Sequence, residues 1–153
     1  MRSEDLEQVK AIVENLDKAN KKVPYFADLQ KHPVYGQFFK DLDSEDIQQI
    51  QKIIDQYIKD KIEGLKTKGG ELFRRFYVIN QDSFWRFRAL NADDSQTDSD
   101  EFQTTGKVIE EQLFKFENIL THTMLKKPQG LDKTVTAYYD IAYSFFPLYN
   151  SIG

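Results

Sequence analysis

A cationic, aromatic stretch lies between residues 66 and 90 and reads KTKGGELFRRFYVINQDSFWRFRAL. It holds 6 Lys or Arg residues against 2 acidic residues, a net charge of +4, whereas the whole chain carries -4. Its arginines are interleaved with Phe, Tyr and Trp at Arg74, Arg75, Arg86 and Arg88. Arginine combined with aromatic side chains is typical of interface anchors and of anion-binding grooves. The stretch therefore predicts a binding surface, and the competing interpretation is structural, with the Phe rings in the core and the arginines as ordinary surface cations.

Aromatic residues also recur near the C-terminus, in a segment with helical periodicity. One stripe contains Tyr139, Tyr143 and Phe146, and a second stripe contains Tyr138, Ile141, Ala142 and Phe145. A helix that is apolar around most of its circumference is either central in a bundle or covered by a partner. The amphipathic tyrosine ring suits interfaces and pocket walls. A central helix is the leading interpretation, and a dimer face or a ligand pocket is the alternative.

These two segments provide the candidate interaction residues. They are Arg74, Arg75, Tyr77, Trp85, Arg86, Arg88, Tyr139, Tyr143 and Phe146.

Catalytic and metal-binding patterns are weak throughout the chain. There is no cysteine, and the 2 histidines, His32 and His122, are too few for most metal sites. The acidic run at 91–100 does not fit a calcium loop, because counting from Asp94 places Ser99 where the loop needs Gly and Thr105 where it needs Glu. The sequence thus favours a non-enzymatic protein, with no catalytic residues, cofactor or metal.

Composition is that of one ordinary globular domain of 153 residues, with 40% hydrophobic and 30% charged residues. The N-terminal sequence MRSEDLEQVK has no apolar stretch of signal-peptide type, and no run approaches the roughly 20 apolar residues of a membrane span. We expect a single helical domain over 1–153 in the cytoplasm, with a mobile acidic loop at 91–100.

Apolar residues repeat at three and four positions along most of the sequence, which predicts long helices over 4–21, 44–66, 99–125 and 132–146. Pro24 and Pro33 each suit the first position of a helix, so two short helices are expected over 24–31 and 34–42. Gly69 and Gly70 are expected to end the second long helix with positive φ. Asp98 and Glu101 have the spacing of a capping box at the start of the third long helix, 99–125.

Residues 72–90 permit two interpretations. As one helix they place Leu72, Phe76, Ile79, Ser83, Phe87 and Leu90 on one face. As a β-hairpin they pair two runs that are rich in strand formers. We favour the helix, because the neighbouring segments are helical and the turn lacks an Asn-Gly type sequence. The fold prediction is therefore all-α, a single compact bundle of about four long helices plus two short ones, and the hairpin at 72–90 would instead make it α+β.

Three classes of function remain open. The leading one is a non-enzymatic protein-interaction or regulatory module, an adaptor or an inhibitor, whose partner is another protein or a second copy of itself. The second is nucleic-acid or polyanion binding through residues 66–88, against which the net negative charge counts. The third is an apolar-ligand binder or small enzyme with a pocket lined by Phe and Tyr.

Overall fold

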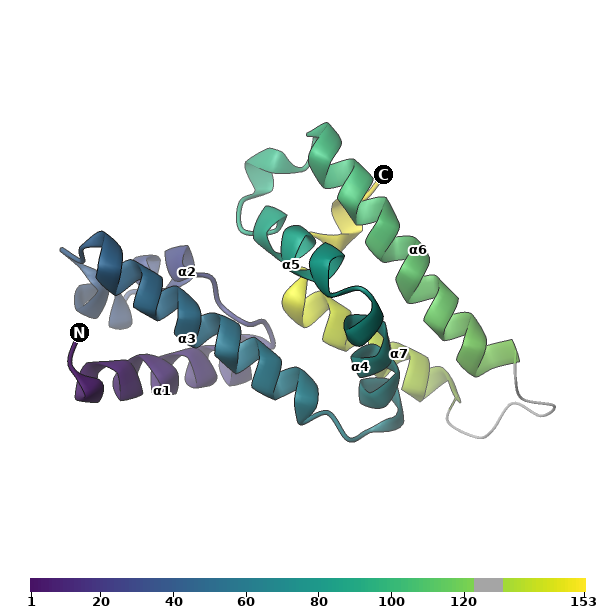
Figure 1. The fold of residues 1–153 in the computed structure, drawn as a ribbon, viewed down its shortest axis with the longest axis horizontal. Coiled ribbons are helices and arrows are strands. Elements are labelled where there is room, and N and C mark those ends of the chain that lie inside the picture. Colours follow the sequence, from purple (N-terminus) through teal and green to yellow (C-terminus); the bar gives the residue numbers. More distant parts are fainter. Residues whose placement is uncertain (123–130) are drawn as a thin grey trace. The chain divides into compact units, whose positions relative to one another are not determined.

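The computed structural model describes residues 1–122 and 131–153, and these residues form helices and no strand (Figure 1). The all-α prediction is confirmed, and the β-hairpin at 72–90 is wrong. The α-helices are α1 (Ser3–Asn20), α2 (Phe26–Lys31), α3 (Ser44–Glu63), α4 (Lys68–Ile79), α5 (Gln81–Leu90), α6 (Asp100–His122) and α7 (Leu131–Phe145). Short 3-10 helices are η1 (Tyr35–Phe39), η2 (Asp94–Gln96) and η3 (Tyr149–Ser151).

The contacts within the chain divide it into two compact units, Met1–Glu63 and Gly64–Gly153, which we call unit 1 and unit 2. The organisation into a single domain stays a prediction.

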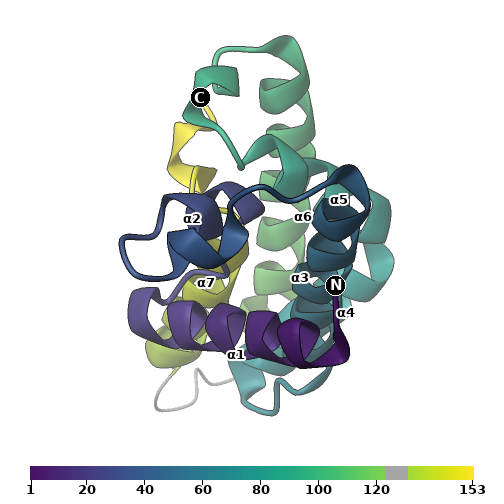
Figure 2. The same cartoon turned by 90° about the vertical axis from the view of Figure 1, so that its left-hand side faces the viewer.

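In unit 1, α1 and α2 both pack against α3 (Figure 2). The apolar positions predicted from the three-and-four spacing are buried, and they are Val9, Ile12, Val13 and Leu16 of α1 and Ile50, Ile54, Ile58 and Ile62 of α3. The segment predicted as a short helix over 34–42 is the 3-10 helix η1. Because both helix faces are built from aliphatic residues, burial of these side chains is the main force that joins α1 to α3.

One buried carboxylate adds a polar link between the same two helices. Asp17 of α1 is buried and accepts a hydrogen bond of 2.6 Å from the Tyr57 hydroxyl of α3. Lys61 Nζ lies 2.8 Å from Asp17 Oδ2 and 2.9 Å from Oδ1. Burial together with the Asp17 carboxylate raises the pKa of Tyr57, because both disfavour the phenolate.

In unit 2, α4 packs against both α6 and α7, and α5 packs against α6. The core between them is mostly aromatic, with buried rings at Phe73, Phe76, Phe84, Phe87, Phe102, Tyr138, Phe145 and Phe146. Phe73 and Phe145 are stacked with their centroids 5.6 Å apart. This core fixes the positions of the helices that carry the candidate surface.

The Gly69–Gly70 pair begins a helix instead of ending one, so the predicted terminator with positive φ is wrong. Both glycines lie in the first turn of α4, whose N-cap Thr67 accepts a hydrogen bond of 3.0 Å from Gly70 N. A Cβ on Gly69 would lie 2.8 Å from the Thr134 carbonyl oxygen and 3.0 Å from Tyr138 N. Glycine is needed here for the close approach of α4 to α7.

The start of α6 also differs from the prediction. Its first turn is capped by Ser99, whose Oγ accepts a hydrogen bond of 3.1 Å from Phe102 N, and not by the predicted Asp98. The predicted end of this helix near residue 125 lies outside the described residues. Residues 91–100 contain turns and η2, and their mobility stays a prediction.

Candidate functional site

The cationic stretch is broken into two helices at Asn80, where the single-helix interpretation had no interruption. Asn80 has φ -119 and ψ 33, outside the helical region, and it separates α4 from α5. Its side-chain amide donates to the Phe76 carbonyl at 3.0 Å and to Gln112 Oε1 of α6 at 3.4 Å. The asparagine therefore ends α4 and holds the break against α6.

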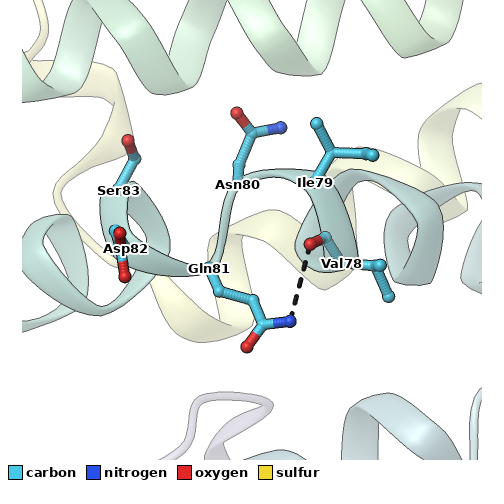
Figure 3. A pocket seen from close by; sticks show the side chains of 6 residues that line it. All are labelled: Val78, Ile79, Asn80, Gln81, Asp82 and Ser83. Carbon is cyan, nitrogen blue, oxygen red and sulfur yellow. Dashed lines mark hydrogen bonds between the residues drawn. The ribbon is translucent and has the colours of Figure 1, made fainter.

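The break leaves two large aliphatic side chains exposed at the end of α4. Val78 is 58% exposed and Ile79 is 70% exposed, although the single-helix interpretation placed Ile79 on the buried face. Figure 3 shows the two side chains leaving the last turn of α4 in different directions. Exposed aliphatic residues of this size next to one another are typical of a contact surface.

These residues line a groove between α4 and α6, which we call the Arg groove. It encloses about 440 Å³ and is lined by Arg74, Arg75, Val78, Ile79 and Phe116. Arg74 is half-buried, and its Nη1 donates to the Leu65 carbonyl oxygen at 3.3 Å. Arg75 is exposed. The lining of the groove is thus almost wholly apolar, although two of its five residues are arginines.

A second hollow of about 490 Å³ lies at the helix break and is lined by residues 78–83 (Figure 3). It shares Val78 and Ile79 with the Arg groove. Gln81 Nε2 reaches back to the Val78 carbonyl oxygen at 3.5 Å, as the dashed line in Figure 3 marks. Polar groups therefore border the exposed aliphatic residues on the side of α5.

The segment that leads into α4 and forms it is positively charged. Residues 66–79 contain Lys66, Lys68, Arg74 and Arg75 against Glu71 alone, which gives a net charge of +3. Since the chain as a whole is at -4, this part of unit 2 is a local cationic surface.

The other candidates of the cationic stretch have different environments. Tyr77 and Trp85 are half-buried, and Trp85 Nε1 donates to the Tyr77 hydroxyl at 3.1 Å. Arg86 is exposed on α5. Arg88 is only 4% exposed, and its Nη1 donates to the Phe145 carbonyl oxygen at 3.0 Å. We therefore place Arg88 with the interior of unit 2.

The aromatic candidates near the C-terminus are also divided between core and surface. Phe146 is buried, with its ring centroid 5.2 Å from that of Phe84 and 5.0 Å from that of Phe87. Tyr139 and Tyr143 are half-buried, and their hydroxyls donate to Glu117 Oε2 at 3.0 Å and to Asn150 Oδ1 at 3.2 Å. The outer stripe of α7 is thus partly accessible, and a dimer through it stays a prediction.

Sequence reasoning did not single out the residues that complete the Arg groove, which are Val78, Ile79 and Phe116. Their helical spacing resembles that of core residues, so periodicity assigned Ile79 and Phe116 to buried faces. A usable signal was the sequence Asn80 to Ser83, because an asparagine followed by polar residues is a helix stop and start signal.

Among residues 1–122 and 131–153, no group of three or more His, Asp or Glu side chains is arranged to hold a metal ion. Nor does any helix in these ranges have the length and apolar character that a membrane crossing requires. No protein-family model, curated protein or solved structure matches the chain. We therefore base the proposed function on the residues of the Arg groove.

Proposed function

We propose that this chain is a non-enzymatic protein-interaction module, an adaptor or an inhibitor, that binds an acidic amphipathic segment of a partner protein in the Arg groove. The observation that carries the proposal is the exposure of Val78 and Ile79 beside Arg74 and Arg75. Arginine is enriched in protein interfaces, and amphipathic helices bind apolar grooves through residues spaced by three and four.

The lining of the groove defines the chemistry of its occupant. Apolar side chains of the partner would cover Val78, Ile79 and Phe116, which removes aliphatic and aromatic surface from water. Carboxylates of the partner would face Arg75, where a guanidinium can form two parallel hydrogen bonds with one carboxylate. The local charge of +3 between residues 66 and 79 supports the same choice.

A protein partner fits this surface better than nucleic acid does. Nucleic-acid binding without sequence preference relies on phosphate contacts and on exposed aromatic rings that stack on bases. The phenylalanines of the cationic stretch, Phe73, Phe76, Phe84 and Phe87, are buried in the core. The half-buried Trp85 is hydrogen-bonded to Tyr77, so the stretch presents cations and aliphatic residues to a partner.

The test is site-specific photo-crosslinking in a lysate of the cells that make the protein. A benzoylphenylalanine in place of Ile79 should capture a segment rich in Asp, Glu and large apolar residues, identified by mass spectrometry. Charge reversal by Arg75→Glu should abolish the capture. The matched controls are the crosslinker at Val34, which is 72% exposed in unit 1, and charge reversal at the exposed Lys10.

Three outcomes would contradict the proposal. In the first, the crosslinkers at positions 79 and 34 capture the same material, which indicates nonspecific contact. In the second, Lys10→Glu reduces the capture as much as Arg75→Glu does. In the third, the captured material is nucleic acid that high salt releases, which favours polyanion binding instead.

A further inference from the structure

Another groove lies on a different flank of α6, and we call it the acidic groove. It encloses about 350 Å³ and is lined by Glu110, Glu111, Phe114, Tyr139 and Tyr149. The first three belong to α6, Tyr139 belongs to α7, and Tyr149 begins η3. Three aromatic rings and two carboxylates therefore meet at one concave site.

The rings of this groove are held in defined positions. The centroids of Tyr139 and Tyr149 are 6.4 Å apart, with their planes inclined at 50°. Tyr143 meets Tyr149 edge to face, with centroids 5.5 Å apart. The hydroxyl of Tyr139 is fixed by its hydrogen bond to Glu117, and Phe114 is 56% exposed. Aromatic surface is thus presented on a preorganised wall, which lowers the entropy lost on binding.

The lining of the groove contains two carboxylates and no Lys or Arg. Glu110 and Glu111 are exposed, and neither forms a salt bridge with a residue in the described part of the chain. Burial, followed in size by the negative charge of Glu110, raises the pKa of Tyr149 to about 12. The negative charge of Glu110, which is the second cause of this shift after burial, also favours a cation in the groove.

We propose that the acidic groove binds an arginine or lysine side chain of a basic peptide. The faces of aromatic rings attract such cations, and the rings also cover the apolar stem of the side chain. Glu110 and Glu111 supply charge-assisted acceptors for its head group. The site shares no residue with the Arg groove, so this proposal and the proposed function stand or fall separately.

Isothermal titration calorimetry with a capped Gly-Ser-Arg-Gly-Arg-Ser-Gly peptide tests the proposal. Saturable binding with one peptide per chain is expected, and the same peptide with citrulline in place of arginine should not bind. Glu110→Gln with Glu111→Gln should weaken binding by about fivefold to tenfold. The matched control is Glu4→Gln with Glu7→Gln, which removes two charges from exposed positions of α1 and should leave the affinity unchanged.

Ring substitutions separate cation–π attraction from bulk charge. Tyr149→Leu should weaken binding by about threefold, whereas Tyr149→Phe keeps the ring and should retain the affinity. Phe114→Leu repeats the test at an exposed position, where loss of folding is not a concern. Three results would overturn the proposal. The Glu110/Glu111 and Glu4/Glu7 double variants would weaken binding equally, the citrulline peptide would bind, or the arginine peptide would show no saturable binding.

Discussion

Phe114 and Phe116 are separated by one residue on α6, and they line grooves of opposite charge. Phe116 forms part of the Arg groove, and Phe114 forms part of the acidic groove. Residues two apart on a helix point about 200° apart, because a turn holds about 3.6 residues. One helix therefore serves two surfaces, with cations of α4 on one flank and its own carboxylates on the other.

Arg75 and Arg88 are expected to respond to mutation in opposite ways. Arg75→Glu should abolish partner capture and leave the thermal midpoint unchanged, since Arg75 is exposed. Arg88→Lys should lower the free energy of unfolding by about 1.5–3 kcal/mol, because it disrupts a buried charged hydrogen bond to Phe145, and should leave capture intact. Urea unfolding and the crosslinking assay measure the two effects. If Arg88→Lys is as stable as the wild type but loses capture, Arg88 belongs to the interaction surface and not to the interior of unit 2.

Gly69 is expected to tolerate a methyl group less well than Gly106. In Gly69→Ala the new Cβ meets backbone atoms of α7 that cannot move independently, at 2.8 and 3.0 Å. We expect a loss of about 1–3 kcal/mol in the free energy of unfolding. In Gly106→Ala the new Cβ meets side-chain atoms and no backbone, with Ile152 Cγ1 at 2.8 Å and Phe87 Cε1 at 3.1 Å.

The gain in helix propensity at Gly106, up to about 1 kcal/mol, offsets part of its crowding. Chemical denaturation of both variants compares the two positions. If Gly106→Ala loses more stability than Gly69→Ala, the close approach of α4 and α7 is not the constraint that the contacts indicate.

Asp17 is expected to stabilise unit 1 far more than the exposed pair on the same helix. Asp17→Asn removes the carboxylate that pairs with Lys61 at 2.8 Å and the charge that accepts from Tyr57. We expect a loss of about 2–3 kcal/mol in the free energy of unfolding. Glu14→Gln removes a solvent-exposed pair with Lys18 and should change stability little. Equal losses in thermal melts of the two variants would contradict this account.

Tyr149 should titrate well above an ordinary tyrosine. Its pKa is raised to about 12, mainly by burial. Because the folded state holds the proton more tightly than the unfolded state, this contribution to stability is complete below pH 10 and is lost as the pH rises through about 12. Absorbance at 295 nm, taken as wild type minus Tyr149→Phe, gives the midpoint. Glu110→Gln should lower it, and a midpoint near 10 would show that Tyr149 is not half-buried as in the structure.

Much of the fold could be predicted from the sequence, because long amphipathic helices have a clear spacing. The boundaries of α1 and α7 agree with the predicted ranges to within one residue. Periodicity could not locate the break at Asn80, since α4 and α5 are both amphipathic and no Gly or Pro separates them. It also could not show that Gly69 serves helix packing, which depends on the distant residues Thr134 and Tyr138.

The residues that line the Arg groove could be predicted from the sequence only in part. Arg74 and Arg75 were identified by charge, and they line the Arg groove. Arg88 and Phe146 have the same residue types as surface anchors, yet they are buried, because burial depends on the tertiary packing of α5 against its neighbours. Glu110 and Tyr149 are 39 positions apart in sequence, so only the fold brings them into one groove.

The most direct test of the central claim is amide chemical-shift mapping of the ¹⁵N-labelled protein with an acidic amphipathic peptide of leucine and glutamate. If the Arg groove is the interaction surface, the largest shifts will fall on residues 74–79 and on Phe116, and Arg75→Glu will remove them. If the largest shifts fall elsewhere, or persist in Arg75→Glu, the Arg groove is not the interaction surface.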